Sequence, residues 1–258
     1  MITRSDAPLI LTSEGTRCGE RLLAVEAPVA VEVNGIGYAV MMATPADLVL
    51  FARGFMLTER LADTPADVLD VDVAEVPLGW IARVTLAERC ADRIGDRVRH
   101  RTSDTGCGLC GISGLEQVAR PLPAPPPAPT AGREAVFRAL GDLRAHQHLN
   151  AATGAVHGAA WCDHEGAIMA IYEDVGRHNA LDKLIGSGLA GDGFLLVTSR
   201  VSFEMVDKAL VARAPMLVGI SAPTTMAVDH ARANGLTLLA LARADAVLVM
   251  HDPHARFA

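Results

Sequence analysis

The chain has 258 residues, half of them hydrophobic and 21% charged, which is enough apolar material for a buried core in one or two domains. Its formal net charge is −7 and it has no block of consecutive Lys or Arg residues, which argues against a nucleic-acid-binding protein. No apolar run approaches the roughly 18 residues of a membrane span, and the first residues lack the apolar segment of a secretory signal, so we expect neither a membrane contact nor export.

The N-terminal part begins with strand-like segments. Asn34-Gly35 lies between two of them and predicts a tight hairpin turn, because both residues tolerate positive φ angles. The other strands of this part are predicted from the alternation of apolar and polar residues and from β-branched residues. The predicted strands are residues 22–25, 29–33, 38–42, 69–75 and 80–86.

A helix is expected directly after the hairpin. Thr44 is a good N-cap and Pro45 suits the first helical position, so the helix is predicted to run from there to about Arg60. With the strands, this makes residues 1–120 a smaller α+β domain.

A glycine-rich segment, residues 105–114, holds Cys107 and Cys110 two residues apart. Four chemistries fit a C-x-x-C pair: a structural zinc site, a thiol–disulfide oxidoreductase, a persulfide relay, or an inert loop pair. Zinc would need a second pair of ligands, which the sequence lacks, so no zinc is expected. The flanking glycines favour a thiol on a flexible arm that can reach two partners, and the arginines at residues 97–101 favour its thiolate form. These arginines could equally belong to a solvated strand face.

The other cysteines form no disulfide pattern. The five are Cys18, Cys90, Cys107, Cys110 and Cys162. An odd number at low density indicates a reducing compartment, so we expect the protein in the cytoplasm.

A proline-rich segment follows the thiol pair. Proline occupies six of the nine positions from Pro121 to Pro129, which predicts an extended linker over residues 121–132. It would separate the N-terminal domain from a C-terminal domain over residues 133–258.

Helices and strands alternate in this C-terminal part. Several strands are continuous apolar runs, such as Phe194–Val197, which is typical of strands buried on both faces of a mixed, mostly parallel α/β sheet. The predicted strands are residues 154–161, 167–172, 194–198, 216–220, 236–241 and 246–250. The predicted helices are residues 133–147, 178–189, 202–213 and 225–234.

Three polar turns connect these strands to the helices that follow. They lie in residues 173–183, 198–204 and 221–225, and strands of one direction would bring them to one crevice. A helix starting at His178 or Asn179 presents free N–H groups that attract anions. The alternative for each turn is ordinary helix capping. His157 lies on an apolar strand and is expected to be a core residue.

Five motifs in this order identify a resemblance to a known family. They are Met41–Pro45, Cys107–Gly111, Glu173–Ala180 with Asp182-Lys183, Arg200–Glu204 and Ser221–Thr224. The chain resembles the FdhD family of sulfur carrier proteins from about Glu26 to His251.

The resemblance implies a sulfurtransferase required for formate dehydrogenase activity. It would take persulfide sulfur from a cysteine desulfurase and deliver it to the molybdenum (or tungsten) bis(molybdopterin guanine dinucleotide) cofactor, bound as substrate, before the cofactor enters apo formate dehydrogenase. It also implies a homodimer and a cytidine-deaminase-like C-terminal domain. By position, Cys107 would carry the persulfide and Cys110 would assist.

The resemblance also implies a cofactor-binding segment, for which GDP should be a mimic. The segment comprises Leu241, Ala242, Arg243, Ala244, Asp245 and Ala246. Near the helix that starts at His178, Arg177 and Arg200 would neutralise phosphate charge.

The chain departs from the family pattern at this segment. Ala240-Leu241 stands where the family usually has Gly-Phe, and Met250 where it has Tyr, although Arg243 remains as a phosphate partner. Deaminase chemistry is not expected, because Ala159 stands where a zinc deaminase needs Glu after its histidine. Two other functions stay open: a cofactor-binding chaperone of apo formate dehydrogenase, and a thiol–disulfide oxidoreductase.

Overall fold

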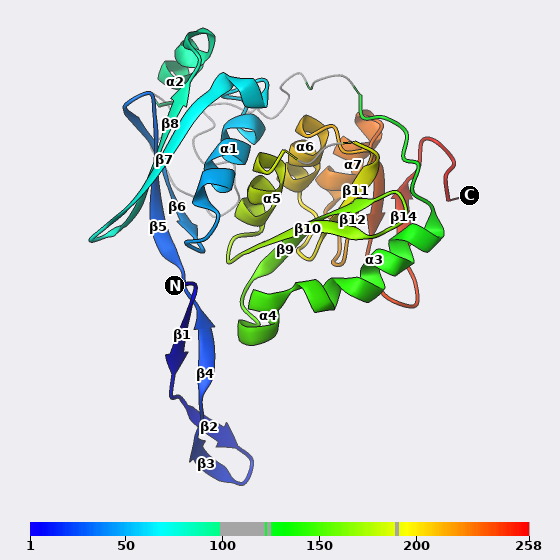
Figure 1. Cartoon of the computed structure of the whole chain (residues 1–258). Helices are drawn as coiled ribbons and strands as arrows, with labels where there is room; N and C mark the ends of the chain where they lie inside the picture. Colours follow the sequence, from blue (N-terminus) through cyan, green and yellow to red (C-terminus); the bar gives the residue numbers. More distant parts are fainter. Residues whose placement is uncertain (99–121, 123–124, 189–190, 258) are drawn as a thin grey trace.

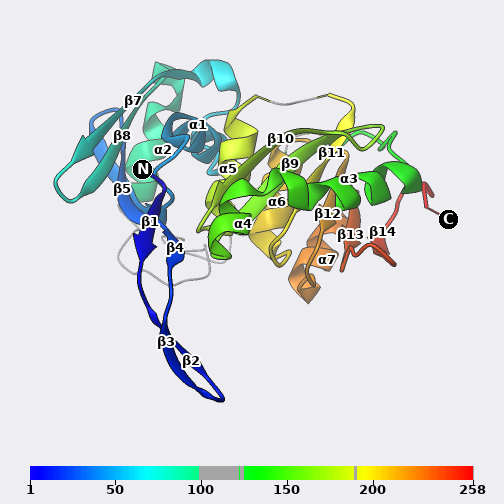
Figure 2. The ribbon, with the colours of Figure 1, turned by 60° about the horizontal axis from the view of Figure 1, so that its bottom comes forward.

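A computed structural model of the chain describes residues 1–98, 122, 125–188 and 191–257. Two sheets, each with its own hydrophobic core, lie side by side, and a narrow ribbon at the N-terminus extends away from both (Figure 1, Figure 2). No helix among the described residues has the length and apolar character needed to cross a membrane.

The N-terminal sheet has four strands in the order β6-β5-β8-β7. Their bounds are Ala27–Val33 for β5, Ile36–Ala43 for β6, Val68–Val76 for β7 and Gly79–Leu86 for β8. Asn34 and Gly35 have φ angles of 48° and 78°, which confirms the predicted hairpin turn. Alternate residues of β5 point into a core that helix α1 (Leu48–Thr58) covers. The predicted α+β character of this part is confirmed.

The predicted start of helix α1 is wrong by three residues. The helix begins at Leu48, and Asp47 before it adopts a left-handed φ of 53°. Thr44 is not the N-cap because its polar groups bond to the C-terminal part of the chain. Its N–H donates to Asp174 Oδ2 at 3.1 Å, and its Oγ1 accepts from the Val175 N–H at 3.1 Å.

The ribbon consists of two short antiparallel pairs, β1 with β4 and β2 with β3. The strands are Thr3–Asp6, Leu9–Thr12, Gly15–Cys18 and Arg21–Ala24 in chain order. Near the junction of the two pairs, Arg21 Nη2 donates to Thr153 O at 2.6 Å, which ties the ribbon to helix α4 (His148–Thr153).

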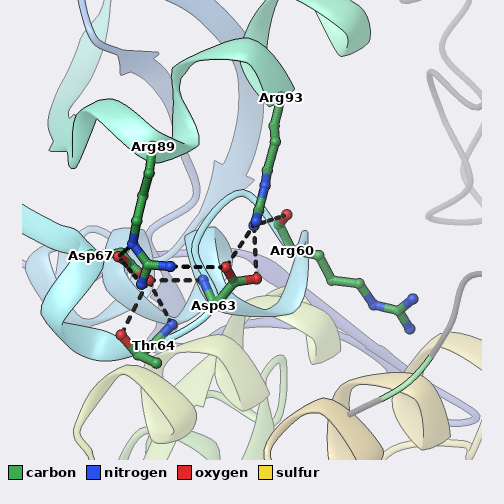
Figure 3. A network of polar contacts seen from close by, with 6 residues as sticks. All are labelled: Arg60, Asp63, Thr64, Asp67, Arg89 and Arg93. Carbon is green, nitrogen blue, oxygen red and sulfur yellow. Dashed lines mark hydrogen bonds and ion pairs between the residues drawn. The ribbon is translucent and has the colours of Figure 1, made fainter.

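A network of ion pairs fastens the short helices that follow β8 (Figure 3). Asp63 accepts two 2.8 Å hydrogen bonds from Arg93 of helix α2 (Ala91–Val98), and buried Asp67 accepts from Arg89 Nε at 2.8 Å. Burial alone would raise the pKa of Asp67, but hydrogen bonds from Thr64 and Arg89 outweigh it and lower the pKa. Helix α2 is thereby held at the point where the chain leads into the thiol segment.

The C-terminal sheet has six strands in the order β10-β9-β11-β12-β13-β14. The strands are His157–Asp163 (β9), Ile168–Asp174 (β10), Gly193–Val197 (β11), Met216–Gly219 (β12), Thr237–Ala240 (β13) and Leu248–His251 (β14). The predicted mixed α/β sheet is confirmed: β10, β11, β12 and β13 run in one direction, and β9 and β14 run in the other. The prediction that its pairing is mostly parallel is wrong. Only β11–β12 and β12–β13 are parallel neighbours, because β9 inserts antiparallel between β10 and β11. The cytidine-deaminase-like character stays a prediction.

Helices cover both faces of this sheet (Figure 1, Figure 2). Helices α5 (Arg177–Gly186), α6 (Phe203–Val211) and α7 (Thr225–Ala233) pack on one face, and α3 (Arg133–His146) packs on the other. The proline-rich segment has no helix or strand in its described part, and Pro126 and Pro129 are buried. The predicted domain boundaries stay predictions.

The two parts of the chain meet where helix α1 packs against helix α5. A Cβ atom on Gly54 would lie 1.8 Å from Asp182 O, and one on Gly186 would lie 1.9 Å from Leu50 O. Neither position has room for a side chain, so the two helix backbones are in direct contact. The interface therefore fixes the N-terminal part against the C-terminal sheet.

Candidate functional site: a basic cluster at the sheet edge

The carboxyl ends of β10, β11, β12 and β13 lie at one edge of the larger sheet. Backbone hydrogen bonds join the loops there: Val201 N donates to Ala222 O at 3.2 Å, and Leu241 N donates to Ser221 O at 3.2 Å. The predicted convergence of the polar turns at one edge is confirmed. In α/β proteins this edge is where ligands bind.

Helix α5 begins at Arg177, one residue before the predicted start, with Gly176 as N-cap. Asp174 stabilises the turn, because its Oδ1 accepts from the Gly176 N–H at 2.8 Å and from Asn179 Nδ2 at 3.1 Å. Asn179 Nδ2 also donates to Met42 O at 2.8 Å. A Cβ on Gly176 would lie 2.7 Å from Asn179 Nδ2, so this turn requires glycine.

The second half of helix α5 is occupied by structural ion pairs. Lys183 Nζ lies 2.6 Å from Asp174 Oδ2, and both side chains are fully buried. Asp182 accepts from Lys208 Nζ at 2.7 and 2.8 Å and from Thr58 Oγ1 at 2.7 Å. These charged residues of the motif therefore connect α5 to α6 and to the N-terminal part, and we do not assign them a ligand.

In the first turn of helix α5, by contrast, polar side-chain atoms lack partners among the described residues. Arg177 Nε and His178 Nε2 are buried and have no hydrogen-bond partner in the described part of the chain. Arg200, in the loop after β11, is exposed. Neither arginine forms an ion pair with any described residue. Two unpaired guanidinium groups at a sheet edge favour an anionic ligand such as a phosphate.

His178 is neutral at ordinary pH. Burial, together with the positive charges of Lys208 and Arg177 and the nearby His157, lowers its pKa to about 3. Its Nε2 lies 3.9 Å from Glu204 Oε2, too far for a hydrogen bond, and that carboxylate accepts from Ser202 Oγ at 2.8 Å instead. His178 is thus a neutral imidazole that can donate or accept a hydrogen bond.

His157, expected from the sequence to be a core residue, belongs to the same group of side chains. It begins β9 directly opposite Asp174, the last residue of β10. Burial, Arg177 and Arg200 lower its pKa, while Asp174 raises it. Arg177 follows Asp174 by three residues, and Arg200 comes two residues after Thr198, which bonds to Gly158 next to His157, so His157, Arg177 and Arg200 all belong to this sheet edge. Strand register brings His157 there, and no local pattern carries that information. We call His157, Arg177, His178 and Arg200 the basic cluster.

The segment from Leu241 to Ala246 follows β13 at the same edge. Ala242 is buried, and its N–H donates to Gly219 O at 3.0 Å. The Arg243 N–H donates to Ala246 O at 2.9 Å, so the segment folds into a turn. The last four residues of the segment, Arg243, Ala244, Asp245 and Ala246, are exposed. Strand spacing places this segment about 10 Å from the end of β11, the strand that leads to Arg200.

The predicted thiols, Cys107 and Cys110, lie outside the described residues. Of the other cysteines, Cys18 is exposed on the ribbon, and Cys90 and Cys162 are buried. Burial raises the pKa of the Cys90 thiol, and it raises that of Cys162 to about 12. Neither buried thiol is a nucleophile at ordinary pH. No group of His, Cys, Asp or Glu side chains within the described ranges could hold a metal ion.

The fold and the site together define a class: a mixed α/β protein with a cluster of unpaired basic side chains at the carboxyl edge of its larger sheet. Residues 24–256 match the family model of the FdhD/NarQ family. The chain therefore belongs to the FdhD/NarQ family.

Two curated relatives show the extent of the similarity. The sulfur carrier protein FdhD of Variovorax paradoxus (strain S110) is 45% identical over 236 residues, 90% of this chain and 85% of that protein. The protein of the same name from Bordetella petrii is 42% identical over 241 residues, 91% of this chain and 86% of that one.

A solved structure has the same fold. It is a crystal structure from Desulfotalea psychrophila, described as a formate dehydrogenase accessory protein, with a TM-score of 0.77, 22% identity and full coverage of both chains. The predicted family and the α/β fold class are confirmed.

Proposed function

We propose that the chain is a sulfur carrier in the maturation of formate dehydrogenase. It would accept persulfide sulfur from a cysteine desulfurase and deliver it to molybdenum bis(molybdopterin guanine dinucleotide), held as substrate, before that cofactor enters apo formate dehydrogenase. The observation that carries the proposal is the similarity to sulfur carrier proteins along nine tenths of the chain. The reducing cytoplasm and a homodimer are part of the same proposal.

Cys107 is the proposed carrier. Its thiolate attacks the outer sulfur of the donor persulfide, so that Cys107–S–SH forms and the donor thiolate leaves. At the acceptor, the Cys110 thiolate attacks the inner sulfur, a Cys107–Cys110 disulfide forms, and sulfide is released to the metal. A cellular thiol then reduces the disulfide. Among the described cysteines only Cys18 is exposed, and it lies on the ribbon away from both sheets.

The basic cluster is the proposed site for the cofactor's phosphates. Arg177 and Arg200 have no carboxylate partner among the described residues, and the N-terminus of helix α5 adds its free N–H groups. The turn from Leu241 to Ala246 would contact the guanine dinucleotide further along the edge. A dinucleotide is long enough to span the roughly 10 Å between these strand ends. GDP is the proposed mimic.

Intact-mass measurement tests the carrier role. The full chain is incubated with a cysteine desulfurase and cysteine, and we expect a mass gain of one sulfur atom that a reductant removes. Cys107→Ala should gain nothing. Cys18→Ala is the matched control, because it removes the exposed thiol of the described residues and should leave the gain intact. A gain in Cys107→Ala equal to that of the wild type would overturn the proposal.

Two functions compete with this one, and the same variants separate them. A chain with both Cys107 and Cys110 replaced by Ala should fail to support formate dehydrogenase activity, whereas a cofactor-binding chaperone would still support it. A thiol–disulfide oxidoreductase would reduce a model disulfide at a rate comparable to thioredoxin, and we expect no such turnover.

A further inference from the structure

His157 is placed among charged groups from three neighbouring elements. On β10 it faces Asp174, whose carboxylate is already paired with Lys183 at 2.6 Å. Arg177 and His178 begin helix α5 just after β10 ends, and Arg200 lies two residues after Thr198, whose N–H bonds to Gly158 next to His157. Burial and the two arginines lower the pKa of His157, Asp174 raises it although it is paired with Lys183, and Glu204 lies 3.9 Å from His178.

The strand pairing holds His157 at the sheet edge. The next residue, Gly158, accepts from the Thr198 N–H at 3.0 Å, and its own N–H donates to Thr198 Oγ1 at 2.9 Å. These bonds tie the start of β9 to the loop that carries Arg200. The imidazole is thus fixed beside both arginines, and it is only partly buried, so a ligand that the arginines bind can reach it.

We propose that His157 is a further ligand-binding residue of the basic cluster and takes up a proton when the cluster binds a phosphate-bearing nucleotide. The proposal rests on the function proposed above, since it assigns a new contact within that site. An anion between His157 and the two arginines removes the repulsion that keeps the imidazole neutral in the free protein. The protonated imidazole then donates a charge-assisted hydrogen bond to the phosphate. His178, more deeply buried, stays neutral and contributes its unpaired Nε2.

This arrangement has a consequence for pH. Because the complex holds more protons than the free protein, nucleotide affinity should rise as pH falls from about 8 to about 6, the range in which histidine titrates. Arginines alone would give no such rise, since they remain charged while the terminal phosphate of GDP, with a second pKa of about 6, gains a proton and loses charge as the pH falls. A GDP affinity that rises as the pH falls therefore indicates a contribution from His157 and not from the arginines.

Calorimetric titration of the full chain with GDP tests this proposal. It is done at about pH 6 and about pH 8, in two buffers of different ionisation enthalpy, so that proton uptake is measured directly. His157→Gln should bind GDP about tenfold more weakly than wild type at the lower pH and lose most of the proton uptake. His164→Gln is the matched control: it lies on the exposed turn at the other end of β9 and should behave as wild type.

The outcomes distinguish this proposal from the one it rests on. If GDP binds equally well to the wild type and to His157→Gln, without proton uptake, the role of His157 is wrong and the cofactor site stands. If GDP does not bind the chain at either pH, or if Arg177→Gln and Arg200→Gln leave its affinity unchanged, the cofactor site itself is wrong. Competition by inorganic phosphate at equal affinity would show a free-phosphate site, which overturns the nucleotide assignment.

Discussion

The two ends of helix α5 use charge in opposite ways. At its C-terminal half every buried charge is paired, as in Asp182 with Lys208 and Lys183 with Asp174. At its first turn Arg177 and His178 keep buried nitrogen atoms that have no hydrogen-bond partner among the described residues. Satisfied buried charges hold a fold together, whereas unsatisfied ones cost stability and persist where a ligand completes them. One motif therefore combines a structural half with a half that we propose to bind a ligand, the binding half.

The largest effect is expected where the structural half leaves no space. In Gly54→Ala the new Cβ would lie 1.8 Å from Asp182 O, so helices α1 and α5 must separate. We expect a loss of more than about 4 kcal/mol in the free energy of unfolding. Chemical denaturation followed by circular dichroism measures it.

Gly141→Ala is the control for this substitution. Gly141 lies in helix α3 with open space around it, so alanine should raise stability slightly through its better helix propensity. If Gly54→Ala were as stable as the wild type, the close packing of α1 against α5 would be wrong.

A smaller loss is expected from Lys208→Met. It leaves Asp182 buried with only Thr58 as a described hydrogen-bond donor, which should cost about 3 kcal/mol. The double variant Asp182→Asn with Lys208→Met should recover part of this loss, because no unpaired charge remains. Equal losses in the single and double variants would contradict a structural ion pair at this position.

Substitutions in the binding half should weaken ligand binding and leave stability nearly unchanged. Arg177→Gln and Arg200→Gln should each weaken GDP binding about tenfold and change the free energy of unfolding by less than about 0.5 kcal/mol. Isothermal titration and denaturation measure the two quantities. Arg138→Gln, which removes an exposed cation from helix α3 on the other face of the sheet, should change neither. A large stability loss in Arg177→Gln would show that Arg177 has a structural role and not a binding role.

Local sequence patterns predicted most of the helices and strands and the convergence of the polar turns, because these depend on periodicity and strand direction. Contacts between distant residues were missed. Thr44 has the sequence features of an N-cap, but its hydrogen bonds go to Asp174 and Val175, about 130 residues later. His157 looked like a core residue because its place opposite Asp174 depends on strand register. The pairing of Asp182 with Lys208 equally requires the packing of α5 against α6.

Acid titration should also distinguish the two kinds of charge. The pKa of His178 falls from 6.5 to about 3 on folding, so the unfolded chain gains a proton that the folded chain does not. Stability should therefore fall as pH drops below about 6.5, by at most about 1.4 kcal/mol per pH unit for one proton, and His178→Gln should remove that part of the loss.

Asp67 titrates in a different range and for a different reason: its folded pKa is also lowered, but by hydrogen bonds from Thr64 and Arg89 that stabilise its charged form despite burial. Its contribution is complete above about pH 4 and is lost only below that, as the carboxylate becomes protonated. Asp67→Asn should consequently flatten the stability profile below about pH 4 and leave the range near pH 6 unchanged. Thermal melts across this pH range measure both windows. If His178→Gln left the loss near pH 6 intact, the surroundings would not hold the imidazole neutral. The binding half of helix α5 would then lack the unfavourable burial of His178 described above.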